Sequence, residues 1–137
     1  MSKQTIERSI WIDAPRERVW KAVTDPAEIA QWFAPGSTFF RQGNSIYLRV
    51  DDADIEVATI EVFDPPRRLT TRELPDKVVT TTYLLEEESG GTRFTVVEEG
   101  LESLGEEARR QRLERDGAGW ERLLAALRAH VATLASS

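Results

Sequence analysis

Residues 120–131, WERLLAALRAHV, carry the pattern that decides the fold. Apolar side chains recur there mainly at spacings of three and four residues: Trp120, Leu123, Leu124, Leu127 and Val131. Residues at that spacing lie on one side of an α-helix, so the segment predicts an amphipathic helix with one continuous apolar face. Such a helix needs another apolar surface to cover that face. The rest of the chain must supply it.

A second helical stretch, residues 105–116, precedes this helix and is highly charged. Glu106 is placed to pair with Arg109 and Arg110, at spacings of three and four residues, which supports a solvated helix. The segment Gly117-Ala118-Gly119 follows it and separates the two stretches. The charged residues fit an exposed helix, the commoner case, or a docking surface for another protein.

Between residues 37 and 98, apolar residues mostly alternate with polar ones, which is the period of β-strands. Turn sequences such as Gln42-Gly43-Asn44-Ser45 divide this region into hairpins. The expected strands are residues 37–41, 46–50, 55–63, 69–74, 78–86 and 92–98. One further strand at 6–12 and two short helices, at 16–24 and 26–33, come before them.

Hairpin-linked strands form an antiparallel sheet, and its inward face is the only surface large enough to cover the C-terminal helix. The sequence therefore predicts an α+β fold, in which a curved antiparallel sheet of about seven strands wraps around a long C-terminal helix. The two short helices after the first strand are expected to close one end of the space between the sheet and the C-terminal helix. A cavity with apolar walls often lies between such a helix and sheet.

The length of 137 residues fits one domain, spanning residues 1–137. Hydrophobic residues make up 40% and charged residues 31%, the balance of a soluble globular protein. No apolar run is long enough to span a membrane, and the first residues lack the apolar segment of a signal peptide. Because the chain has no cysteine, disulfides and thiol nucleophiles are excluded. We expect a cytoplasmic protein.

The charged and ionisable residues exclude further classes of function. A net charge of −6 disfavours nucleic acids and anionic membranes as partners. The only histidine, His130, is expected in solvent at the end of a helix, and one histidine cannot form a two-histidine metal site. No phosphate-binding loop, nucleophile elbow or metal-ligand cluster is present. We therefore expect no cofactor, no metal and no catalytic residue, and nothing compels an enzyme.

Four aromatic residues are candidates for the wall of the cavity: Trp32, Phe39, Tyr83 and Trp120. Tryptophan and tyrosine combine a large apolar area with one polar group, which suits a pocket that orients a mainly apolar ligand. Trp32 and Phe39 flank residues 34–36, a loop that could form the mouth. Ordinary core packing is the alternative, and the pattern around Tyr83 does not decide which way that side chain faces.

The carboxylates come mainly in runs at strand ends and turns, where exposure to solvent is the usual explanation. Residues 51–54, residues 86–88 and the pair Glu98-Glu99 are interpreted in this way. Glu61 is an exception, because its place in an alternating strand could turn it inward. A buried Glu61 would need a partner, and Arg72 is the candidate.

Five segments resemble the SRPBCC, or START-like, superfamily, and within it the branch named after the C-terminal domain of the activator of heat-shock protein 90 ATPase. They are IWIDAPRERVWKAVTDP (residues 10–26), IAQWFAP (29–35), DPPRRL (64–69), GGTRFTV (90–96) and GWERLL (119–124). The resemblance spans nearly the whole chain, with the segments in the family's order. It implies the helix-grip fold and its hydrophobic cavity.

The resemblance also implies which residues contact a ligand. Trp120 and Leu124 would do so from the last helix. The branch often has a tryptophan after its "RRL" element, whereas this chain continues Thr70-Thr71-Arg72, which makes Arg72 or Thr71 a candidate polar group of the pocket wall.

Three functions follow from the resemblance. The first is non-catalytic binding of a small hydrophobic or amphipathic molecule, as a carrier, a sensor or a stress-related protein. The second is a polyketide-cyclase-like enzyme, which would need Arg72, Glu61 or Tyr83 to converge in the cavity. The third and weakest is regulation of a chaperone ATPase, because the proteins that gave the branch its name contact the chaperone through another domain. A monomer and a homodimer both remain open.

Overall fold

The computed structural model describes residues 5–34 and 36–135. The chain begins with β1 (Ile6–Ile12), α1 (Arg16–Thr24) and α2 (Pro26–Trp32). Six strands follow: β2 (Ser37–Gln42), β3 (Ser45–Val50), β4 (Ala53–Asp64), β5 (Arg68–Glu73), β6 (Thr80–Glu88) and β7 (Gly91–Glu99). A single 3₁₀ turn (Leu101–Ser103) then leads into the long helix α3 (Glu106–Ala135). This order confirms the predicted α+β fold.

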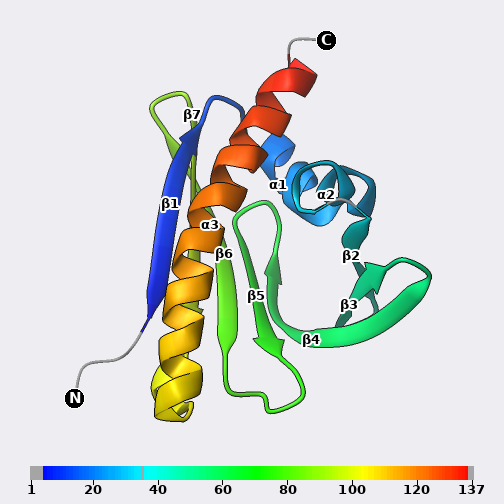
Figure 1. Ribbon diagram of the computed structural model, residues 1–137. Helices are drawn as coiled ribbons and strands as arrows, with labels where there is room; N and C mark the ends of the chain where they lie inside the picture. The colour runs from blue at the N-terminus through cyan, green and yellow to red at the C-terminus, as the bar shows by residue number, and fades with distance from the viewer. Residues whose placement is uncertain (1–4, 35, 136–137) are drawn as a thin grey trace.

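The strands form one antiparallel sheet in the order β1-β7-β6-β5-β4-β3-β2. The long strand β4 changes register twice, opposite the step from Ile46 to Tyr47 in β3 and again between its own Ile60 and Val62. Each change inserts an extra residue into the ladder, and such bulges bend a strand. In Figure 1, β4 curves strongly and carries β2 and β3 away from β1.

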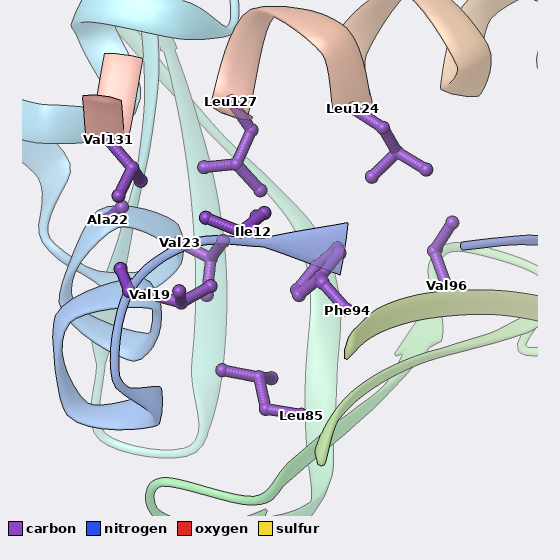
Figure 2. Packing of buried hydrophobic residues seen from close by; sticks show 11 residues of the cluster. Ile12, Val19, Ala22, Val23, Leu85, Phe94, Val96, Leu124, Leu127 and Val131 are labelled. Carbon is purple, nitrogen blue, oxygen red and sulfur yellow. The ribbon is translucent and has the colours of Figure 1, made fainter. Parts of the chain in front are cut away.

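Helix α3 lies across one face of the sheet and packs along β1, with α1 and α2 near its C-terminal end (Figure 1). Leu124 and Leu127 point from α3 toward Ile12 of β1 and Phe94 of β7 (Figure 2). Ile12, Phe94 and Leu127 are each at most 1% exposed. This cluster is the helix-on-sheet core that the apolar stripe of the C-terminal segment predicts.

Gly100 directs the chain from β7 toward α3. Its φ is +91°, and a Cβ there would lie 2.2 Å from the carbonyl oxygen of Val78, so only glycine fits. The following residue, Leu101, is fully buried in a small cluster with Ile6 and Val79. This contact fixes the start of α3 beside the ends of β6 and β7.

The two expected helical stretches form one continuous helix, and Gly117 and Gly119 lie inside it. A Cβ on Gly117 would lie 2.8 Å from the guanidinium of Arg8 in β1, so glycine leaves room for that side chain against the helix. Glycine in a helix costs about 1 kcal/mol relative to alanine. Packing against the sheet stabilises the helix despite that cost.

The expectation that His130 lies in solvent was wrong. Its side chain is only 11% exposed, and its Nε2 lies 3.0 Å from Oε1 of Glu28 in α2. Arg18 of α1 pairs with the same carboxylate at 2.9 Å. The carboxylate of Glu28 therefore joins all three α-helices, a contact between distant parts of the chain that no local pattern could indicate.

Candidate functional site

A cavity of about 740 Å³ lies between α3 and the part of the sheet that curves away from it. Its lining comes from all three helices and from β2 to β7. Alternate residues of single strands line it, for example Ile46 and Leu48 of β3, and Thr81 and Tyr83 of β6. Alternate side chains share one face of a strand, so the cavity is bounded by one face of the sheet.

Aromatic side chains form the wall near α2. Trp32 donates a hydrogen bond from Nε1 to the carbonyl oxygen of Ala22 at 2.8 Å, which fixes the orientation of its ring. Phe33 and Phe39 pack edge to face with their ring centres 4.8 Å apart. Trp32, Phe33 and Phe39 all line the cavity. This region offers a rigid apolar surface without a charged group.

Tyr83 lies deeper in the cavity, between sheet and helix. Its ring contacts Phe94 at 5.3 Å and Trp120 at 6.1 Å between ring centres. Burial, together with the nearby carboxylate of Glu98, raises the pKa of Tyr83 to about 12. The phenol is therefore neutral at physiological pH and can both donate and accept a hydrogen bond.

Glu98 of β7 lies beside Tyr83 and is the most deeply buried charged residue of the lining, at 3% exposure. Trp120 donates a hydrogen bond from Nε1 to one carboxylate oxygen, and Arg112 donates from Nε to the other at 2.9 Å. Burial raises the pKa of Glu98 and outweighs these two hydrogen bonds, which lower it. The expectation that Glu98 lies in solvent was wrong.

Arg112 of α3 connects the helix to two strands at this end of the cavity. Besides Glu98, its guanidinium binds both carboxylate oxygens of Glu73 in β5, and its Nε lies 3.2 Å from the carboxylate of Asp116. These contacts raise the pKa of Arg112, so the guanidinium stays charged. Glu73, Glu98, Arg112 and Asp116 all line the cavity and are called its polar end below.

The structure brings four of the six sequence-predicted ligand residues into the lining: Trp32, Phe39, Tyr83 and Trp120. Arg72 is outside it, because Arg72 lies on the other face of β5 from Thr71 and Glu73, which do line the cavity. Its guanidinium pairs with Glu61 at 2.7 Å, the partnership expected from the sequence, but both side chains are more than one-third exposed.

Leu124 is also outside the lining. It is 3% exposed and packs in the main core, so its neighbour Leu123 reaches the cavity instead. Both residues belong to the same apolar stripe of the helix. The stripe predicts that both face the sheet, but not which of them meets packed side chains and which meets open space.

The polar end is the part of the site that sequence reasoning missed. Two signals could have indicated it. Glu98 continues the alternation of Phe94 and Val96, both buried, which places all three on one face of β7. Arg112 and Asp116 precede Trp120 at steps of four residues, which places them on the same side of α3 as that tryptophan.

Within residues 5–34 and 36–135, no group of three or more His, Asp or Glu side chains is arranged to hold a metal ion. No helix in these ranges is long and apolar enough to cross a membrane.

Several solved structures share this fold. BH1534 from Bacillus halodurans is 26% identical, with a TM-score of 0.73 over 96% of this chain and 99% of that one. The Aha1 dimer from Colwellia psychrerythraea is 14% identical, with a TM-score of 0.75 over 93% and 96%. DynU16, from the dynemicin biosynthetic locus, is 23% identical with a TM-score of 0.66; the match covers 94% of this chain but 47% of DynU16.

No protein with a curated description matches the chain significantly. The profile of one family, described as activator of Hsp90 ATPase homolog 1-like protein, matches residues 13–132. The match includes all elements from α1 to the 3₁₀ turn, α3 as far as residue 132, and every residue of the cavity lining. This agrees with the resemblance in the sequence motifs and with the helix-grip arrangement of sheet and helix. The chain belongs to the activator of Hsp90 ATPase homolog 1-like family, within the SRPBCC superfamily.

Proposed function

We propose that this protein binds a small apolar or amphipathic molecule in the cavity between α3 and the sheet. The observation that carries the proposal is the cavity itself, with a volume of about 740 Å³ and a lining made mainly of aromatic and aliphatic side chains. Cavities of roughly 300–1,000 Å³ with a few polar groups are typical of sites for small organic ligands.

The arrangement of the lining supports an amphipathic rather than a purely apolar ligand. Trp32, Phe33 and Phe39 offer an apolar surface, whereas Glu98 and Arg112 are charged groups elsewhere in the same lining. A ligand with one polar end could satisfy both regions at once. A purely apolar ligand would displace water from these charged groups and offer no partner to their remaining hydrogen-bonding positions, which is costly.

Native mass spectrometry tests this proposal. Protein purified from its own cell extract is compared under native and denaturing conditions, and a discrete extra mass that is lost on unfolding is expected. An apo mass in every preparation, together with no binding of added hydrophobic probes, would contradict the proposal.

A matched pair of variants localises the ligand. Gly119 lines the cavity, and a Cβ there would meet no atom within 4 Å, so Gly119→Phe should direct its ring into the cavity and occupy part of the space for a ligand. Ala118→Phe places the same side chain at the adjacent, exposed position. The extra mass should disappear in Gly119→Phe and persist in Ala118→Phe. Its persistence in both folded variants would place the ligand elsewhere.

Acid–base catalysis on a polyketide-like chain is the second candidate function. The observation favouring it is that Glu98, whose pKa is raised by burial, lies beside the neutral phenol of Tyr83 in the cavity. Wild type and Glu98→Gln would be incubated with a linear poly-β-ketone thioester and the cyclised product followed by mass spectrometry. Product from the wild type alone is expected; equal product from both would reject a role for Glu98.

A further inference from the structure

The polar end of the cavity carries an excess of negative charge. Three carboxylates, those of Glu73, Glu98 and Asp116, surround the single guanidinium of Arg112. Arg115 also pairs with Asp116, but its side chain is 73% exposed and is not part of the lining. An ion pair with a solvent-exposed arginine contributes little, so Arg115 compensates the excess negative charge of the polar end only weakly.

The same groups also have more hydrogen-bond acceptors than donors. Each carboxylate has about four acceptor positions, and each oxygen of Glu98 receives one protein hydrogen bond, from Arg112 or from Trp120. Within the described residues, the half-buried side chain of Tyr83 makes no hydrogen bond, and its hydroxyl is open to the cavity. A ligand group that enters the polar end therefore meets unoccupied acceptor positions on the carboxylates and a Tyr83 phenol that can accept or donate a hydrogen bond.

The only other cation in the lining is Arg41, which is held away from the polar end. Its guanidinium lies 4.2 Å over the ring of Phe63, and its Nε donates to the carbonyl oxygen of Gly43 at 3.1 Å. Phe63 is 45% exposed, so this cation lies at the solvent side of the cavity. Among the described residues, it forms no ion pair with Glu73, Glu98 or Asp116.

We propose that the ligand has an apolar body and a cationic nitrogen group, such as a protonated amine, that binds at the polar end beside Glu98 and Asp116. An ammonium group supplies three donors and one positive charge, which match the excess of acceptors and of negative charge. The rings of Tyr83 and Trp120 add cation–π attraction. This inference rests on the proposed function and specifies its ligand class.

Three probes with one body and different end groups test the inference: 2-naphthylmethylamine, 2-naphthylmethanol and 2-naphthoate. Their dissociation constants would be measured by titration of amide chemical shifts, which detects weak binding and shows where each probe lies. The amine should bind at least tenfold more tightly than the alcohol, and the carboxylate more weakly than both. The shifts should centre on residues around Glu98 and Trp120.

Variants then assign the preference to the polar end. Glu98→Gln and Asp116→Asn each keep the shape of the side chain and remove one negative charge, and either should reduce the ratio of amine to alcohol affinity severalfold while the alcohol still binds. Glu61→Gln is the matched control, because Glu61 also pairs with an arginine but lies outside the lining. It should leave the ratio unchanged. Asp116→Asn also covers the case in which Glu98→Gln fails to fold.

The outcomes separate the two proposals. If no probe binds, the inference fails, and the proposed function fails with it where native mass spectrometry also shows only the apo mass. If the probes bind in the cavity but the alcohol or the carboxylate equals or exceeds the amine, the proposed function stands and the amine preference is refuted. Carboxylate preference would instead assign ligand recognition to Arg112. An amine preference that survives both Glu98→Gln and Asp116→Asn would also refute the assignment to the polar end.

Discussion

The two halves of α3 meet the same sheet in different ways. The C-terminal half is packed, with Leu124, Leu127 and Val131 at most 3% exposed against the core. The N-terminal half presents Arg112 and Trp120 to the cavity. One helix therefore holds the fold together mainly through its C-terminal half and lines the candidate site between Arg112 and Leu123.

The difference originates in the sheet rather than in the helix. Ile12 of β1 and Phe94 of β7 pack against the C-terminal half of α3, whereas the bulges of β4 bend β2 and β3 away from the helix and leave space. Protein interiors are normally close-packed, so a cavity of this size means that contacts which would add stability are not made. Stability and binding can therefore be changed separately along α3.

The largest expected effect comes from two neighbouring leucines of α3. Leu124→Ala should lower the free energy of unfolding by about 3 kcal/mol, because it creates a void in the packed core. Leu123→Ala should cost about 1 kcal/mol or less, because its side chain already borders open space. Urea unfolding of both variants measures the difference. Equal losses would mean that the side of α3 facing the core and the side facing the cavity do not differ in packing as described.

The polar end gives the next largest effect. Arg112→Gln leaves the buried carboxylate of Glu98 without its cation and should cost about 2 kcal/mol. Arg110→Gln is the control on the same helix, because Arg110 pairs with Glu107 and Glu114 on the exposed side and its loss should change the stability far less. Chemical unfolding at neutral pH compares them. A cost for Arg112→Gln no larger than that of the control would show that the buried network adds no stability.

The pH dependence of stability provides a smaller effect at the same place. Because burial raises the pKa of Glu98 above its ordinary 4.5, the folded protein holds this proton to higher pH than the unfolded chain. The stability that the protonated group contributes is complete below about pH 4.5. It is lost as the pH rises through the raised value in the folded protein. Glutamine is neutral at every pH and does not lose this stability. Glu98→Gln should therefore become more stable relative to wild type as the pH rises through the pKa of Glu98 in the folded protein.

Exposed Glu99 is the control for this measurement. Unfolding curves of wild type, Glu98→Gln and Glu99→Gln would be recorded from pH 4 to pH 8. The difference between wild type and Glu99→Gln should stay nearly constant, because Glu99 lies on the outer face of β7. A difference between wild type and Glu98→Gln that stays constant, or that moves in the opposite direction, would contradict the raised pKa.

The fold was predictable because the spacing of apolar residues within each short segment indicates whether that segment is a strand or a helix. Alternation marked each strand, and the stripe from Trp120 to Val131 marked the helix that covers them. The side of the sheet to which Tyr83 points was not predictable, because threonines on both sides of the strand obscure the alternation. It follows from the register, in which Tyr83 lies opposite Val96 of β7.

The polar end was missed because its parts come from distant segments. Glu98 stands next to Glu99, and the pair looks like a solvated strand end. Its partner Arg112 belongs to a charged stretch that looks like an exposed helix. Each local interpretation was reasonable, and only the docking of α3 on the sheet brings the two side chains to 2.9 Å.

The smallest effect is expected for a substitution of Arg72. Compared with a substitution of Thr71, it tests which face of β5 lines the site. The ion pair of Arg72 with Glu61 is exposed on both sides, so Arg72→Ala should change the free energy of unfolding by about 0.5 kcal/mol or less. It should also leave the amine affinity unchanged. Thr71→Leu, at the adjacent position in the lining, should alter that affinity severalfold because it narrows the cavity. If Arg72→Ala weakened binding as much as Thr71→Leu, the ligand would have to reach the outer face of the sheet, and the assignment of the site to the cavity would fail.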